Sequence, residues 1–247
     1  MISCHKLTKT FGAAVAVDGL TLEVPAGAIC AFMGPNGAGK STTVNMLTGL
    51  LRPTSGDATV AGLSILTGGV ELRRRMGVLP ANLGLFEDLT VQEHLLLTGD
   101  IYGLSGEETR SRAGQLLRAL DLENGRDLFA SRCSTGMRKK AALAMALIHN
   151  PPVLFLDEPF EAIDPLTSRT IGELLRTISA RGTTVFLTSH ILSTIERMAT
   201  QFVLIRHGKI AWNSTAAELT RPLEELYFEL IEYPPVEDLA WLGSDRS

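Results

Sequence analysis

A glycine-rich segment carries the clearest chemical signal in the chain. It reads Gly34-Pro35-Asn36-Gly37-Ala38-Gly39-Lys40-Ser41 and fits the pattern G-x-x-x-x-G-K-[ST] between an apolar run and a helical pattern. Glycines let the backbone curl so that its N–H groups point at phosphate oxygens, and the following helix offers its positive end to the same anion. We therefore expect this loop, together with Thr42, to bind nucleotide phosphates. The pattern assigns Lys40 to the β- and γ-phosphates and the Ser41 hydroxyl to Mg²⁺.

Two adjacent carboxylates supply the second signal. Residues 153–156 are apolar throughout, which predicts a buried strand, and Asp157 and Glu158 follow it directly. Ligands bind at the carboxyl ends of strands in α/β sheets, so both carboxylates should lie at the functional edge. Asp157 would bind Mg²⁺, and Glu158 would polarise a water for in-line attack on the γ-phosphate. Alone this pattern is more often a plain strand end, but beside a phosphate loop it indicates a nucleotide-hydrolysing core.

The first 65 residues, which must position the phosphate loop, read mainly as strands. Apolar residues recur there between turn signals, and one helical segment follows the loop. The predicted strands cover 2–7, 15–24, 28–33 and 58–61, the turns 25–27 and 55–57, and the helix 40 to about 51.

Helical patterns dominate the rest of the chain. A capping box at Thr90–Glu93 and a serine at position 105 each open an apolar-periodic stretch, which predicts a small helical insertion. Beyond Ser134, helices alternate with strands, so we expect an α/β fold with a mainly parallel sheet and helices on both faces. The predicted elements there are helices 137–149 and 165–182, strands 153–156 and 183–188, an edge hairpin of 202–206 with 209–212, and a helical tail from 215 to about 232.

Composition limits the class of protein. The 247 residues include 27 acidic and 23 basic side chains, a net charge of −4 that argues against a dedicated nucleic-acid binder. No apolar run reaches the roughly 18 residues that a membrane span needs. Three widely spaced cysteines suit a reducing cytoplasm better than a disulfide framework or a metal site. Two basic clusters, at 73–75 and 138–140, are expected to be solvated surfaces.

Over roughly residues 2–220, these motifs and their order resemble the nucleotide-binding subunit of ATP-binding-cassette (ABC) transporters. Ser134-Thr135-Gly136-Met137 stands where that family has its signature, a helix start at which Ser134 and Gly136 would face the ATP held by a partner subunit. As a bare pattern, without the family context, the segment more often marks a simple serine helix cap.

Three further positions match motifs of the same family. Residues 162–165 resemble its dimer-contacting loop, although Asp164 also suits a helix cap. His190 matches the switch histidine that touches the γ-phosphate. Phe11 stands where the family stacks an aromatic ring on adenine, and a core phenylalanine is an equal alternative.

The resemblance implies a P-loop NTPase fold with a mainly parallel sheet flanked by helices, an N-terminal antiparallel β-subdomain and a helical subdomain at about 85–133. Residues 1–220 would form the ATPase domain and 221–247 a short C-terminal extension. ATP and Mg²⁺ are the implied ligands, with Glu158, His190 and Lys40 as catalytic residues and Ser41 and Asp157 at the metal.

The same resemblance implies how the chain would work with partners. Two subunits, identical or different, would close head to tail around two ATP molecules and power a separate transmembrane permease, closest in pattern to ABC-2 type exporters. The chain would lie in the cytoplasm on the inner face of the cell membrane and reach the membrane only through the permease. No nucleic-acid partner is expected.

The chain departs from the family pattern in ways that keep alternatives open. Ala81 stands where the family usually has a glutamine that orders Mg²⁺ and water, so Asn82 or water would have to substitute. Thr135 and Met137 replace the usual glycine and glutamine of the signature, a variation associated with exporters. A regulatory or non-transport ABC ATPase with low turnover is therefore the alternative. A kinase is opposed by the signature and by His190.

Overall fold

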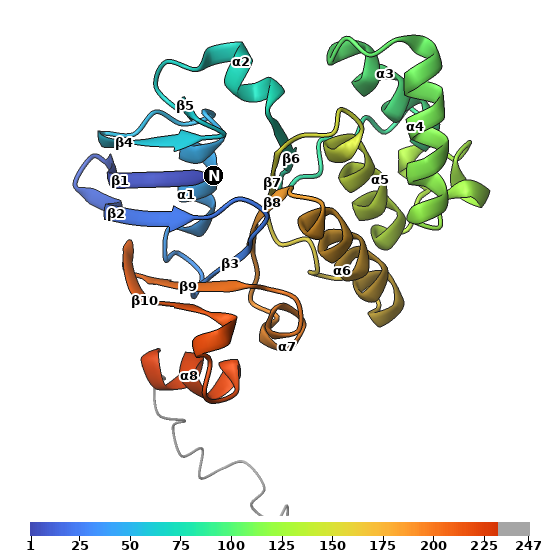
Figure 1. Ribbon diagram of the computed structural model, residues 1–247. Coiled ribbons are helices and arrows are strands. Elements are labelled where there is room, and N and C mark those ends of the chain that lie inside the picture. The colour runs from blue at the N-terminus through green and yellow to red at the C-terminus, as the bar shows by residue number, and fades with distance from the viewer. Residues whose placement is uncertain (232–247) are drawn as a thin grey trace, which may run out of the picture.

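Strands of two β-sheets position the phosphate loop, the two adjacent carboxylates and His190. The computed structural model describes residues 1–231, and within them an antiparallel sheet lies beside a mainly parallel one (Figure 1). The antiparallel sheet has the order β2-β1-β4-β5 and contains β1 (Ile2–Phe11), β2 (Ala14–Val24), β4 (Ser55–Val60) and β5 (Leu63–Ser64). The parallel sheet has the order β10-β9-β3-β8-β7-β6 and contains β3 (Ile29–Met33), β6 (Met76–Leu79), β7 (Val153–Leu156), β8 (Thr184–Thr188), β9 (Gln201–Arg206) and β10 (Lys209–Thr215). Its edge pair β9–β10 is the predicted antiparallel hairpin.

Helices cover the sheets and form the predicted helical insertion. The helices are α1 (Lys40–Leu47), α2 (Gly69–Arg74), α3 (Val91–Ile101), α4 (Gly106–Ala119), α5 (Thr135–Leu147), α6 (Pro165–Ala180), α7 (Leu192–Glu196) and α8 (Leu223–Leu230). The insertion consists of α3 and α4, which stand together at one end of the molecule beside α5 (Figure 1). The Thr90–Glu93 capping box that opens α3 is formed as predicted.

The central strands are buried on both faces, as their unbroken apolar runs predict. Along β3, Ile29, Ala31 and Met33 contribute to the core shared with α5 and α6, whereas Cys30 and Phe32 contribute to the core shared with α1 and the antiparallel sheet. Strands β3, β8 and β7 pair side by side and parallel, so their carboxyl ends lie at one edge. The phosphate loop follows β3, Asp157 follows β7, and His190 follows β8. The topology therefore brings the three motifs together.

Several predicted boundaries are wrong. Helix α1 ends at Leu47 rather than near 51, because the chain turns at Gly49, whose φ is +70°. Residues 55–57 are not a turn but the start of β4, where a Cβ on Gly56 would lie 2.2 Å from the Lys6 carbonyl oxygen of β1. Pro222 divides the helical tail into a 3₁₀ turn (Ala216–Glu218) and α8. Elements α2, β5, β6 and α7 were not predicted, because each has six residues or fewer and none is an unbroken run of large apolar residues like that of β7.

The prediction that the basic cluster at 138–140 is solvated is also wrong. Lys139 and Lys140 are only 7% and 8% exposed. Arg138 donates two hydrogen bonds, at 2.7 and 2.9 Å, to the carboxylate of Glu87. Because other elements pack around helix α5, each of the three cations contacts a different neighbouring segment. The cluster at 73–75 is exposed, as predicted.

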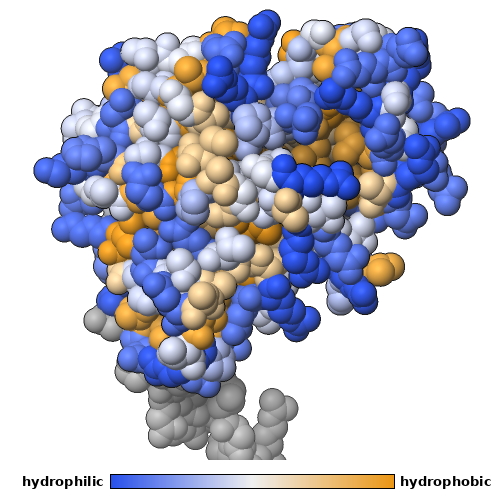
Figure 2. Space-filling view, in the orientation of Figure 1, coloured by the Kyte–Doolittle hydropathy of each residue, from blue (hydrophilic) through white to orange (hydrophobic). Residues whose placement is uncertain are grey.

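The lengths of the helices and the surface of one face can also be described. None of the helices within residues 1–231 is both long and apolar enough to cross a bilayer. Hydrophobic side chains on the face drawn in Figure 2 form patches among hydrophilic ones. Part of the expected C-terminal extension, residues 232–247, lies outside the described residues.

Candidate functional site

The phosphate loop between β3 and α1 is shaped by close backbone contacts that only glycine permits. A Cβ on Gly34 would lie 2.3 Å from the Ile205 carbonyl oxygen, and a Cβ on Gly39 would lie 2.4 Å from the Ala16 carbonyl oxygen. Gly39 also has φ +108°, which side-chain-bearing residues rarely adopt. No side chain caps α1, so its first N–H groups remain available to an anion.

Lys40 lies buried at the centre of this loop. Its ammonium donates hydrogen bonds to the carbonyl oxygens of Gly34, at 2.8 Å, and Pro35, at 3.3 Å. It also lies 4.0 Å from Oε1 of Glu158. The lysine therefore joins the phosphate loop to the carboxylates at the end of β7.

A cavity of about 610 Å³ opens over the loop and gathers most of the predicted site. Its lining combines residues from the ends of three neighbouring strands with a side chain from the C-terminal helix. The lining residues are Ala16, Gly34, Pro35, Asn36, Gly37, Gly39, Lys40, Ser41, Thr42, Asp157, Glu158, Glu161, His190 and Tyr227. Ala38, although in the loop, is a buried packing residue outside that lining.

The two carboxylates are held differently. Asp157 is buried, its N–H donates to the Leu79 carbonyl oxygen, and its Oδ1 accepts a 2.6 Å hydrogen bond from the Thr188 hydroxyl. Glu158 has φ +49°, a left-handed conformation that costs about 1–2 kcal/mol in a residue with a Cβ. Its Oε2 lies 2.9 Å from Nδ1 of His190. The glutamate and the histidine thus form one pair facing the cavity.

The donor set of the cavity fits Mg²⁺ bound together with a nucleotide. Ser41 and Asp157 line the cavity and have side-chain oxygen atoms that would suit Mg²⁺, which characteristically takes one or two carboxylates and completes its shell with phosphate oxygens and water. Within residues 1–231 no cluster of three or more His, Cys, Asp or Glu side chains could hold a metal by itself. The residues present therefore suit a metal that arrives with phosphate.

The signature-like segment lies outside this cavity. Ser134 caps α5, and its hydroxyl accepts a 3.2 Å hydrogen bond from the Met137 N–H. Ser134 and Thr135 are exposed. Gly136 approaches the start of α6, where its added Cβ would lie 3.2 Å from Oγ1 of Thr167. The structure thus separates Ser134 and Gly136 from the phosphate loop of the same chain.

Asp164 forms the cap of α6 that the sequence allows. Its carboxylate accepts hydrogen bonds from the N–H groups of Leu166 and Thr167 and from the Thr167 hydroxyl. The Thr167 hydroxyl and N–H hold the pKa of Asp164 below its usual value. Because Gly136 packs against the same residues, the starts of α5 and α6 form one surface.

Other predicted positions also lie apart from the cavity. Phe11 is 52% exposed, which excludes the core-phenylalanine alternative, and the Lys9 ammonium lies 5.2 Å from its ring centroid. Phe11 does not line the cavity. Ala81 and Asn82 are exposed and also do not line it.

Among the residues that hold or line the site without having been predicted, Thr188, Tyr227 and Lys139 make the most informative contacts. No predicted role was attached to Thr188, and only its place at the end of β8 could have suggested that its hydroxyl binds Asp157. Tyr227 comes from α8, far along the chain, and nothing in its local pattern links it to the phosphate loop. Lys139 was assigned to a solvated surface, whereas its ammonium binds the carbonyl oxygens of Glu158 and Glu161.

Comparisons with known proteins place the chain in a family. Residues 17–161 match the domain family described as ABC transporter. The chain is 37% identical over 222 residues to the daunorubicin/doxorubicin resistance ATP-binding protein DrrA of Streptomyces peucetius, with 90% of this chain and 67% of that protein covered. The chain belongs to the ABC transporter family. It is an ATP-binding, ATP-hydrolysing member of that family.

Other similar proteins agree with this family and with its fold. Nod factor export ATP-binding protein I of Paraburkholderia xenovorans is 38% identical over 217 residues, which cover 87% of this ABC chain and 71% of that protein. A solved ATP-binding subunit of an ABC transporter aligns with TM-score 0.86 and 33% identity, covering 93% of this chain and 99% of that one. A dimeric ATP-binding cassette in a post-hydrolysis state with ADP and phosphate aligns with TM-score 0.81 and 27% identity, covering 87% and 99%. The predicted P-loop NTPase fold is confirmed.

Proposed function

We propose that this ABC ATPase hydrolyses MgATP as half of a head-to-tail pair of subunits and thereby drives a separate transmembrane permease. One observation carries the proposal: the chain has two helix starts suited to phosphate, and they lie in different places. The phosphate loop opens into the cavity with Glu158 and His190, whereas Ser134 and Gly136 lie outside it. A second subunit would bring its signature to this cavity.

Hydrolysis would proceed by direct attack of water on the γ-phosphate. Glu158 is the proposed base: its carboxylate accepts a proton from water as the water oxygen bonds to phosphorus and the bond to the β–γ bridging oxygen breaks. His190, 2.9 Å from Glu158, orients that carboxylate, and Lys40 stabilises the phosphate charge. Mg²⁺, when bound, would neutralise charge on the leaving diphosphate, and Ser41 and Asp157 are the residues that would hold it.

The signature would complete the site of the opposite subunit. Ser134 caps α5 at an exposed position, so the helix presents its positive dipole end and unpaired N–H groups outward. ATP would bridge this helix start and the phosphate loop of the other subunit, two positive ends that otherwise repel each other. Loss of the γ-phosphate removes the bridge, and the pair opens.

Export is the proposed direction of transport. Two relatives are named for drug resistance and for Nod factor export, and both are ATP-binding proteins. We assign permease docking to the helical subdomain at about 85–133, which exposes Phe86, Leu97 and Ile101. The pair, of two identical or two related chains, would then lie on the inner face of the membrane.

Phosphate release by the purified full chain tests the proposed activity. We expect steady release from MgATP that stops when EDTA removes the metal, and a loss of about 100-fold or more in Lys40→Ala, because the lysine stabilises charge that develops during transfer. Ala81, outside the cavity, favours the low-turnover alternative as the second candidate. Release at background level in the parent chain would support that alternative and contradict ours.

A further inference from the structure

Lys139 is a buried cation that this mechanism does not use. It lies on α5, shortly after Ser134, and burial lowers the pKa of its ammonium. The ammonium donates hydrogen bonds to the main-chain oxygens of Glu158, at 2.7 Å, and of Glu161, at 2.5 Å. Burying a charge is unfavourable unless it is well partnered, so these two carbonyl groups account for its presence.

The two hydrogen bonds hold a backbone segment that contains two residues in the left-handed conformation. Glu158 and Ala162 have φ values of +49° and +55°, both left-handed. The Glu158 N–H donates to Oγ1 of Thr188 at 3.0 Å. Thr188 from β8 and Lys139 from α5 therefore fix the Glu158 residue from its two main-chain ends. The side chain between them extends to His190 and the cavity.

We propose that Lys139 is a positioning residue for ATP hydrolysis, which holds the main chain at Glu158 so that the carboxylate points into the nucleotide cavity. The proposal rests on the role of Glu158 proposed above. Without the ammonium, two part-buried carbonyls lose a charged donor, and the backbone at Glu158 can leave its left-handed conformation. The phosphate loop has its own anchor in Lys40. Removing the Lys139 ammonium should thus lower kcat and leave ATP binding nearly unchanged.

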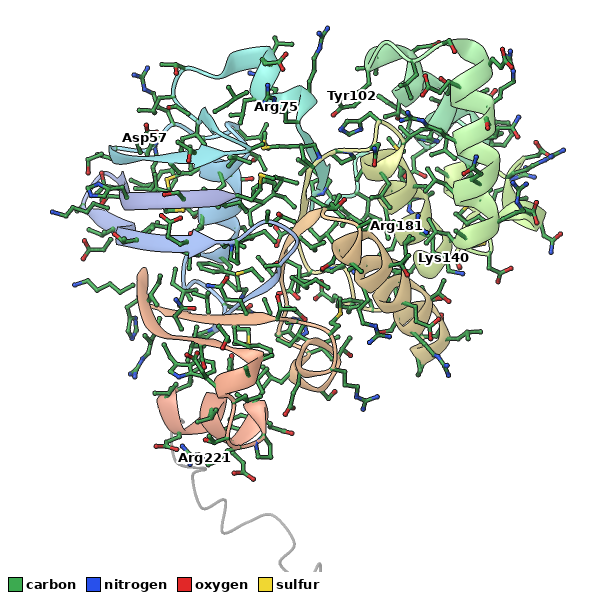
Figure 3. The ribbon with its side chains drawn as sticks, viewed as in Figure 1. Asp57, Arg75, Tyr102, Lys140, Arg181 and Arg221 are labelled. Atoms are coloured by element: carbon green, nitrogen blue, oxygen red, sulfur yellow. The ribbon has the colours of Figure 1, made fainter. Side chains whose placement is uncertain are left out.

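The neighbouring lysine provides a matched control. Lys140, which Figure 3 labels, is also buried on α5. Its ammonium lies 4.0 Å from Oδ2 of Asp121, just beyond α4. Arg138, on the other side, binds Glu87 and the Ala130 carbonyl oxygen. Three consecutive cations thus contact three separate parts of the fold. Within residues 1–231, Lys139 donates hydrogen bonds to the loop after β7, whereas the bonds of Arg138 and the ion pair of Lys140 join α5 to other segments.

Lys139→Met and Lys140→Met, made in the full chain, separate positioning from packing. Methionine keeps a long flexible side chain and removes the donors in both variants. We expect Lys139→Met to lower kcat by about 10- to 100-fold, since small misplacements of a catalytic group have effects of this size. Its KM for MgATP should stay within about threefold, and Lys140→Met should keep both constants within about twofold. ATP binding and thermal unfolding are measured on each protein.

Rescue by variants that retain donors completes the test. Lys139→Gln and Lys139→Arg keep N–H groups, so at least one should exceed Lys139→Met in kcat by about threefold or more. Three results would overturn the positioning role. They are a kcat that neither variant restores, an equal loss of kcat in Lys139→Met and Lys140→Met, and a loss of kcat that follows ATP affinity or unfolding temperature. Full ATPase in Glu158→Gln would instead refute the role of Glu158 that is part of the proposed function. An inactive Glu158→Gln beside a fully active Lys139→Met would refute the positioning role alone.

Discussion

Helices α1 and α5 both begin at segments that we propose bind phosphate, yet their surroundings differ. Helix α1 follows a loop shaped by glycine contacts, has no side-chain cap, and opens onto a cavity lined by Glu158 and His190. Helix α5 begins at Thr135 and is already capped by the Ser134 hydroxyl, and both of these residues are exposed outside that cavity. One start lies with the proposed catalytic groups of its own chain, and the other does not.

The difference shows that a helix cap and an anion site can be distinguished by whether a side chain already binds the first N–H groups of the helix. A capped helix start such as that of α5 is stable without a ligand, so its stability says little about its function. An uncapped start such as that of α1 leaves N–H groups for the ligand itself. Substitutions at α1 and its cavity should therefore test chemistry within one chain, whereas those at α5 should test contact between chains.

The largest effect should come from the cavity side of this comparison. Glu158→Gln removes the proposed base and should lower kcat by about 100-fold or more, because general-base catalysis contributes at least that much. ATP binding should persist, and the pair should remain closed and detectable by sedimentation in MgATP. The control is Glu161→Gln, because the Glu161 carboxylate lines the same cavity without a proposed role in catalysis. This variant should retain activity. Unchanged phosphate release in Glu158→Gln would refute the role of Glu158.

Ser134→Arg tests the other helix start. A bulky cation there should block the contact with a partner's nucleotide and lower turnover by about 100-fold, since a lost transition-state contact has that scale. Binding of ATP to the single subunit should stay near normal, measured with a fluorescent analogue.

Ser105→Arg is the matched control for this variant. Ser105 caps α4 with the same geometry, accepting a 3.2 Å hydrogen bond from the Glu108 N–H. Both substitutions lose a serine cap, a destabilisation of about 1 kcal/mol. Only Ser134→Arg should lose turnover. If ATP binding by the single subunit is lost as well, the assignment of Ser134 to the partner's site is wrong.

The smallest effect should come from Ala81, which lies just beyond β6. Because β6 pairs with β7, a glutamine at this position would extend from the same sheet edge as Asp157. We expect Ala81→Gln to raise the ATPase rate by about twofold by helping to order water and Mg²⁺. The ATPase rate of Asn82→Ala, measured in parallel, shows whether the Asn82 side-chain amide already helps to order water and Mg²⁺. A rate unchanged by Ala81→Gln would mean that the loop is not limiting.

The sequence predicts the cavity side of the molecule better than the α5 side. The phosphate loop and residues 157–158 each follow an apolar run, and parallel pairing of β3, β8 and β7 converts that local pattern into proximity. Strand ends are set by short-range patterns, so these residues could be assigned from the sequence. Their chemical roles remain predictions.

Contacts between distant elements could not be read in the same way. Lys139 looks like a surface residue in sequence, because three adjacent cations are usually solvated. Its burial depends on how α5 packs against the loop after β7, and Tyr227 reaches the cavity only because α8 folds back. Tertiary packing decides such positions, and local spacing does not encode it.

Specific ATPase activity measured against protein concentration tests the pairing of subunits most directly. The purified chain is diluted in saturating MgATP without detergent, and sedimentation at each concentration reports whether it is monomeric. If each site needs the signature of a second subunit, activity per molecule should fall in step with the fraction of paired chains. Constant activity per molecule at concentrations where the chain is wholly monomeric would contradict the account.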